Sequence, residues 1–220
     1  PEDVMRQMER ALINRWKKAC DDGERMFESE FLFDIFRDGK MAEHYQIAPA
    51  NSWMLAAMEA DIPVYCPGWE DSTTGNMFAA AVYRGEVPHH QCVKSGTEQM
   101  EHLVRWYLQN CGQPGKPGSD NADIPTHPGV GFFQVGGGIA GDFPICAVPT
   151  IIQDLQRDDV PYWAYFAQIS DAVTSYGGYS GAVPNEKITW GKLDVDTPKF
   201  MIQSDATIVA TLIFGYILGD

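Results

Sequence analysis

The stretch "VGFFQVGGG", residues 130–138, decides the fold class because a short apolar run leads directly into three glycines. The run is aromatic and β-branched, which is typical of a buried strand. Glycine has no Cβ, so the chain can turn sharply there and approach a bound group closely. We therefore predict a buried strand that ends in a tight turn and leads into a helix.

Strands and helices alternate in the sequence outward from this stretch. Further strands are predicted at residues 62–68, 160–170 and 198–205. Helices are predicted at residues 1–20, 29–39, 49–61, 76–85, 95–110, 143–158 with a kink at Pro149, and 206–218. Strands that alternate with helices are typical of a parallel sheet. We expect an α/β fold with a doubly wound, mostly parallel, Rossmann-like sheet and helices on both faces.

Local signals mark several of the helix ends. Asn51 or Ser52 is expected to cap the helix at 49–61, and Ser204 or Asp205 the helix at 206–218. Ser95 is followed three residues later by glutamate, the pattern of a capping box. We assign residues 1–220 to a single domain, with residues 111–128, rich in Gly, Pro and Asp, as its one long loop.

Composition and charge exclude several function classes. The net charge of −14 disfavours nucleic-acid binding, which needs a clustered cationic surface, and is compatible with a cationic ligand such as a polyamine. Five widely spread cysteines form no CxxC pair, which favours a reducing cytoplasm over a disulfide framework or a zinc site. The most apolar run, residues 208–218, is too short to span a bilayer. We predict no metal site, because the histidines have no partners at ligand spacing.

Two loops that follow predicted strands could bind a ligand. In "QVGGGIAGD", residues 134–142, the glycines and the following helix could receive an anion, or they could form a plain tight turn. In "GWEDSTTGNM", residues 68–77, the acids could bind ribose hydroxyls or an ammonium group, or Asp71 or Ser72 could simply cap a helix.

A long loop rich in Gly, Ser and Tyr, residues 170–192, ends on Lys192. Long loops in compact domains are often functional. A lysine amine lined by Trp190 and other apolar groups would be a nucleophile suited to imine chemistry, because burial disfavours the charged form. Alternatively, Lys192 pairs with Glu186 or Asp194 at the surface.

Three segments in this order carry a family resemblance: "GGG" after a strand, "SGAVPNEKITWGKL", and "SDATIV". Together they resemble the deoxyhypusine synthases, and most of all the bacterial deoxyhypusine synthase-like branch, some of whose members make homospermidine. The resemblance runs from about Trp53 to the C-terminus. The family is longer at its N-terminus, so we expect that the N-terminal part of the family fold is absent from this chain.

The resemblance implies a reaction and the residues that perform it. In the family NAD oxidises a donor polyamine, spermidine or putrescine, and the lysine of the WGK tripeptide accepts an aminobutyl group as an imine. By this resemblance Lys192 is the nucleophile, and Glu186 and Trp190 line the polyamine pocket. The residues that match NAD-contacting positions are Asp71, Gly137, Asp205 and Ala206, with Asp171 and Ala172 as a looser match. The resemblance also implies a homotetramer.

The sequence departs from the hypusine-forming enzymes at several positions. Asn76 stands where those enzymes have aspartate, and Asp142 where they have histidine. Tyr176, Gly178 and Tyr179 replace acidic residues. We therefore expect a rebuilt polyamine site to which Asn76, Asp142 and Tyr179 contribute, and an aminobutyl transfer to a small amine such as putrescine. The alternatives are true deoxyhypusine synthesis on a translation factor, and an inactive subunit that binds NAD or polyamine.

Overall fold

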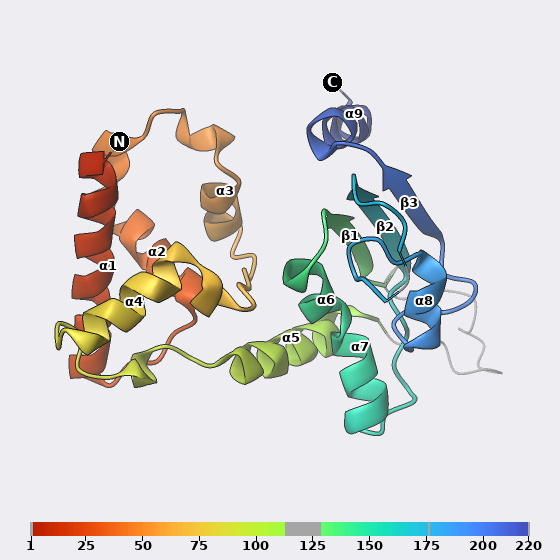
Figure 1. Ribbon diagram of the computed structural model, residues 1–220, viewed down its shortest axis with the longest axis horizontal. Coiled ribbons are helices and arrows are strands. Elements are labelled where there is room, and N and C mark those ends of the chain that lie inside the picture. The colour runs from red at the N-terminus through yellow and green to blue at the C-terminus, as the bar shows by residue number, and fades with distance from the viewer. Residues whose placement is uncertain (1, 113–128, 176, 220) are drawn as a thin grey trace. The chain divides into compact units, whose positions relative to one another are not determined.

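The computed structural model describes residues 2–112, 129–175 and 177–219. Most of the loop predicted at 111–128, and Tyr176, lie outside the described residues. The chain divides into two compact units, of which one ends at Gln99 and the other begins at Met100 (Figure 1). Each unit is described by itself.

The first unit is helical. Its helices are α1 (Glu2–Asp22), α2 (Glu28–Asp38), α3 (Trp53–Glu59), α4 (Thr73–Tyr83) and the start of α5 (Gly96–Asn110). Short 3-10 turns lie between them: η1 (Ala42–His44), η2 (Pro49–Asn51), η3 (Trp69–Asp71) and η4 (His90–Cys92). These positions confirm the helices predicted in this half of the sequence.

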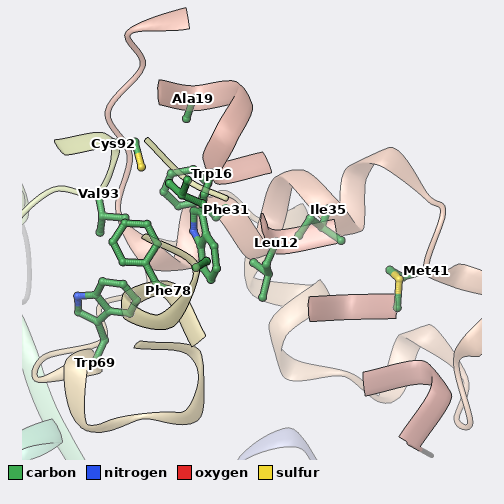
Figure 2. Packing of buried hydrophobic residues seen from close by; sticks show 12 residues of the cluster. Leu12, Trp16, Ala19, Phe31, Ile35, Met41, Trp69, Phe78, Cys92 and Val93 are labelled. Atoms are coloured by element: carbon green, nitrogen blue, oxygen red, sulfur yellow. The ribbon is translucent and has the colours of Figure 1, made fainter. Parts of the chain in front are cut away.

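An aromatic cluster forms the core of the first unit (Figure 2). The Trp16 ring meets the edges of Phe31 and Phe78, with ring centroids 6.5 Å and 4.9 Å away. Trp16 is buried because it lies on the same face of α1 as Leu12 and Ala19, the spacing that the sequence showed. This cluster joins α1, α2 and α4 into one body.

The predicted helix caps are present. Ser52 Oγ accepts a hydrogen bond from the backbone N–H of Leu55, which identifies Ser52 as the cap of α3. Ser95 and Glu98 form the capping box of α5, since the Ser95 N–H donates to Glu98 Oε2 at 2.8 Å and the Glu98 N–H donates to Ser95 Oγ at 3.3 Å.

The prediction of a strand at residues 62–68 is wrong. No neighbouring strand pairs with it among the described residues, and side chains take up its backbone groups instead. The Cys66 N–H donates to Glu28 Oε1 and Gln99 Oε1, both at 3.1 Å, and Ser29 Oγ donates to the Val64 carbonyl at 2.6 Å. The apolar run is therefore an extended segment held by α2 and α5.

The second unit is built on a parallel sheet of three strands. These are β1 (Gly131–Val135), β2 (Tyr165–Ser170) and β3 (Lys199–Gln203), in the order β1-β2-β3. The other elements are α6 (Ile139–Ile145), α7 (Ala147–Pro149), the π-helical turn η5 (Thr150–Asp154), α8 (Pro184–Thr189) and α9 (Ala206–Leu218). The α/β class is confirmed, and in the described sheet the strand order runs in one direction without reversal.

Helices lie on both faces of this sheet. The ring of Phe133 on β1 is 5.5 Å from that of Phe214 on α9. Phe132 and Gln134 point to the opposite face, where α6 approaches so closely that a Cβ on Gly141 would lie 2.7 Å from Gln134 Cδ. Among the described residues, no helix is long and apolar enough to cross a membrane.

The helical segment predicted at 143–158 ends at Asp154 in the structure and differs in two further ways. It begins earlier, at Ile139, and it is interrupted at Cys146 rather than at Pro149. Pro149 lacks an N–H and cannot bond to the carbonyl four residues before it, that of Ile145. The Ile145 carbonyl instead accepts the indole N–H of Trp163 at 3.1 Å. The break therefore lies one turn before the proline that causes it.

Candidate active site

The carboxyl ends of the three strands meet at one edge of the sheet. Val135 pairs with Ile169, and Ser170 pairs with Gln203. The hydrogen bonds continue one residue further, because the Gly136 N–H donates to the Ile169 carbonyl at 2.7 Å and the Ser204 N–H to the Ser170 carbonyl at 3.1 Å. The three loops that follow therefore start side by side, at the edge where open α/β sheets bind ligands.

Five of the residues predicted to contact NAD lie in these loops. They are Gly137 after β1, Asp171 and Ala172 after β2, and Asp205 and Ala206 after β3. Asp171 and Asp205 are exposed. Asp205 is the cap of α9, since its Oδ1 accepts from the Thr207 N–H at 2.7 Å. The hydrogen bond from the Thr207 hydroxyl, and then the one from this N–H, lower the pKa of Asp205.

The three glycines after β1 differ in what surrounds them. Gly136 and Gly138 have positive φ angles of 81° and 72°, and no atom lies within 4 Å of where a Cβ would be. A Cβ on Gly137 would lie 2.3 Å from Ser180 Oγ and 2.6 Å from Ser180 Cα. The absence of a side chain at Gly137 is thus required by the neighbouring loop, whereas Gly136 and Gly138 border open space.

Two buried glutamines join the loop at 136–138 to the loop at 177–181. Gln168 Nε2 donates to the carbonyls of Gly136 at 3.0 Å and Ser180 at 3.1 Å. Gln134 Nε2 donates to the same Gly136 carbonyl at 2.8 Å, and its Oε1 accepts the Tyr179 hydroxyl at 2.8 Å. Neither glutamine was predicted as a site residue from the sequence, where the available signal was a polar residue in the middle of each apolar strand.

The WGK tripeptide is the end of α8. Gly191 has a φ of 66°, its N–H donates to the Ile188 carbonyl, and the Lys192 N–H donates to the Lys187 carbonyl, each at 2.9 Å. This pair of hydrogen bonds is a Schellman motif, which favours glycine at the left-handed position. The long loop predicted at 170–192 is therefore wrong at 184–189, where Pro184 starts a short helix.

Lys192 is paired with Asp142, a partner that neither sequence alternative named. Lys192 Nζ donates to Asp142 Oδ1 at 2.7 Å, and the two side chains are 13% and 48% exposed. The same Nζ lies 5.4 Å from the centroid of the Tyr179 ring. Asp142 is in the first turn of α6, so the turn after β1 and the end of α8 together place the pair.

Glu186 and Trp190, the other residues of the predicted polyamine pocket, flank this lysine in sequence. Glu186 Oε1 is buried without a hydrogen-bond partner, and Oε2 makes one long contact of 3.5 Å with the Gly177 N–H. A buried carboxylate oxygen without a donor is costly and suits a cationic group. Trp190 is 67% exposed and leaves an open aromatic face.

A second lysine that the sequence analysis did not single out is buried beside the first. Lys187 is 3% exposed, and its Nζ donates to the Ala182 carbonyl at 3.3 Å. The ammonium lies 4.8 Å from the ring centroid of Phe166 and 5.1 Å from that of Tyr179. Burial, and then the charge of Lys192, lower the pKa of Lys187 to about 8.

Asp71 and Asn76 belong to the first unit, whereas the Lys192 cluster is built from the second alone. Asp71 borders a cavity of about 350 Å³ together with the buried Glu28. The helix cap at this loop is Ser72, whose Oγ accepts from the Gly75 N–H at 3.0 Å. Asn76 Nδ2 donates to the Ser72 carbonyl at 2.9 Å. The capping interpretation thus holds for Ser72 and leaves the Asp71 carboxylate available.

The arrangement around Lys192 supplies the parts needed for imine chemistry. A largely buried amine has a carboxylate at hydrogen-bond distance that can take its proton. The Tyr179 ring lies against this amine, and α8, which ends just before it, carries the unpartnered carboxylate oxygen of Glu186; both groups favour cations. Among the described residues, no group of three His, Cys, Asp or Glu side chains could hold a metal ion.

Comparison with known proteins agrees with the sequence resemblance. The family model for deoxyhypusine synthase matches residues 2–217. A deoxyhypusine synthase-like protein of Cyanothece is 28% identical over 215 residues, which are 96% of this chain and 50% of the relative. Probable deoxyhypusine synthase 2 of Archaeoglobus fulgidus is 27% identical over 194 residues, 88% of this chain and 54% of the relative. The chain spans about half the length of the curated relatives it matches.

Proposed function

Because this chain belongs to the deoxyhypusine synthase family, we propose that it carries the imine-forming lysine of an NAD-dependent aminobutyl transferase. The observation that supports this most directly is the position of Lys192, which is 13% exposed and hydrogen-bonded to Asp142 at 2.7 Å. Lys192 lies in the WGK segment that the Schellman motif fixes.

In the proposed reaction the chain's own residues handle the proton and the aminobutyl group. Asp142 accepts a proton from the Lys192 ammonium, which leaves a neutral amine. This amine attacks the imine carbon of the oxidised donor, a new carbon–nitrogen bond forms, and the bond to the departing amine breaks while Asp142 returns the proton to it. An acceptor amine then repeats the exchange and frees Lys192. The hydride acceptor for the donor amine, and the hydride donor for the product, would be NAD held by the residues named in the next paragraph.

The residues proposed to bind NAD offer the open space and the exposed carboxylates that this cofactor requires. Gly136 and Gly138 leave open space beside the backbone, so a cofactor can approach it closely. Asp171 and Asp205 follow the next two strands at the same edge and are exposed, so they are available to ribose hydroxyls. Ala172 and Ala206 complete the proposed cofactor contacts within the second unit, whereas the assignment of Asp71, in the first unit, rests on the sequence resemblance alone.

We assign the substrate to the small polyamines, spermidine or putrescine as donor and putrescine as acceptor, which gives homospermidine. Glu186 Oε1 offers an unpaired buried acceptor to one ammonium group. Trp190 and Tyr179 offer aromatic faces, and Asp142 completes the proposed site within the second unit; the assignment of Asn76, in the first unit, rests on the sequence resemblance alone. The doubly wound sheet, the homotetramer and the cytoplasmic location are parts of the same proposal.

A trapping experiment tests the proposal. The protein is incubated with NAD and spermidine, the mixture is reduced with borohydride, and the peptides are analysed by mass spectrometry. We expect an aminobutyl adduct on Lys192 that Lys192→Arg abolishes and Lys199→Arg, the matched control, leaves unchanged. An adduct on Lys187 or Lys199 contradicts the assignment.

The product distinguishes the proposed function from its rivals. Free homospermidine supports transfer to a small amine. Modification of a translation-factor lysine without a free polyamine product would identify a true deoxyhypusine synthase. Binding of NAD or spermidine without any adduct would identify an inactive binding subunit.

A further inference from the structure

Lys187 is a buried ammonium with neutral hydrogen-bonding surroundings. Its Nζ contacts a backbone carbonyl and two aromatic rings, and no carboxylate among the described residues lies within ion-pair distance of it. Lysine is rarely fully buried unless it is paired. A residue this costly to bury suggests a role in the site that it borders.

The geometry links this ammonium to the amine of Lys192 in two ways. The Lys187 carbonyl accepts the backbone N–H of Lys192 at 2.9 Å, so the two residues are fixed to one helix end. Their ammonium groups also share the Tyr179 ring, at 5.1 Å and 5.4 Å from its centroid. A displacement of the Lys187 ammonium would therefore change the packing of the Tyr179 ring, against which Lys192 lies.

The charges that face Lys187 come from three elements. Lys192, after α8, opposes its protonation, while Glu186 on α8 and Asp142 on α6 favour it. The Tyr179 hydroxyl is engaged with Gln134 and its pKa is raised by burial, so it remains neutral. The repulsion between the two ammonium groups is mutual, because both lie against the Tyr179 ring and like charges repel.

We propose that Lys187 is a positioning residue for Lys192, whose positive charge offsets that of Asp142 and keeps a larger share of the Lys192 amine in its neutral, nucleophilic form. Asp142, at 2.7 Å, stabilises the unreactive ammonium of Lys192, and without Lys187 no neighbouring positive charge on the Tyr179 ring would oppose this effect. This inference rests on the nucleophilic role given to Lys192 in the proposed function. It adds a residue that lies outside the polyamine and cofactor contacts named there.

The test measures the reactivity of Lys192 without NAD or polyamine. The 220-residue chain is treated with butanal and cyanoborohydride. The amine and the aldehyde form an imine with loss of water, and hydride from cyanoborohydride reduces it to a secondary butylamine. Mass spectrometry then gives the labelling rate at Lys192 for the wild type, Lys187→Met, Lys187→Arg and the control Lys199→Met. Lys187→Gln, which can keep a hydrogen bond to Ala182, replaces Lys187→Met if the latter does not fold.

At pH 7 we expect Lys187→Met to slow labelling of Lys192 roughly three- to tenfold, with recovery in Lys187→Arg and no change in Lys199→Met. The labelling rates of the wild type and of Lys187→Met should converge by about pH 10, because Lys187 in the wild type has then lost its positive charge. A rate ratio that is the same at every pH, or equal rates at pH 7, overturns the proposal. Either result leaves the trapping test of the proposed function intact, because that test does not depend on Lys187.

Discussion

Raising the pH should stabilise this protein through Lys187. Below about pH 8 the lysine is protonated in both the folded and the unfolded state. Between about 8 and the unfolded value of 10.5 it is neutral when folded and charged when unfolded, so the unfolded state binds more protons and stability rises with pH. For these two pKa values the gain from pH 7 to 9.5 is about 2 kcal/mol.

Other groups titrate in the same interval and act in the opposite direction. Burial raises the pKa of Cys66 to about 11 and that of Cys92 to about 12, so their thiols ionise first in the unfolded state and reduce stability as the pH rises. The Lys187 contribution is therefore isolated as a difference between wild type and Lys187→Met. The cysteines contribute equally to both proteins and cancel.

The assay is urea unfolding followed by circular dichroism at pH 7 and 9.5. We expect the free energy of unfolding of the wild type, relative to Lys187→Met, to increase by about 2 kcal/mol between the two pH values. At pH 7 the methionine variant should be at least as stable as the wild type, because it buries no charge among the aromatic rings. An identical pH response in both proteins refutes the reasoning.

Three further predictions follow from individual contacts. Asp142→Asn should cut transfer to a small amine because the proton acceptor is lost, and Asp142→His should cut it because the fixed anion that favours a second ammonium group is lost; product formation measured by mass spectrometry checks both. Gly137→Ala should lower the free energy of unfolding by about 1–3 kcal/mol. Adding Ser180→Gly should recover only part of this lost stability, because the Cα of residue 180 remains 2.6 Å from the added carbon. Urea unfolding of the single and double variants checks this. Gly75→Ala should destabilise the first unit to a similar or greater extent, since its Cβ would lie 2.3 Å from a backbone oxygen, which a lowered thermal midpoint would reveal.

The elements that could be predicted from sequence are those with strong local signals. The strand at 131–135 and the glycines after it, the cap at Ser52 and the box at Ser95 were all predictable, because each depends on a few adjacent residues. Gly137, Asp171 and Asp205 lie at one edge of the sheet because parallel strands end on the same side, while their roles as cofactor contacts stay predictions of the resemblance. Lys192 was singled out through its WGK segment.

The predictions that failed depend on contacts between distant residues. The run at 62–68 has the composition of a strand, but its backbone bonds to side chains of α2 and α5, which no local pattern reveals. The partner of Lys192 is 50 residues away in sequence, so the nearby acids Glu186 and Asp194 were the natural candidates. Lys187 lies in a polar run, and its burial depends on residues distant in sequence, because its ammonium packs against the rings of Phe166 on β2 and Tyr179.

The contact of Gly137 with Ser180, together with the two hydrogen bonds from Gln168, has a consequence for anyone who builds chimeras of this protein. A graft that replaces the turn after β1 but keeps the loop at 177–181 would bring together two surfaces shaped for different neighbours. A residue larger than glycine at position 137 needs a loop at 177–181 that is shorter or displaced, because the added side chain would overlap Ser180. The two segments are therefore a single module despite the roughly 40 residues between them, and they should be exchanged, randomised or selected as a pair.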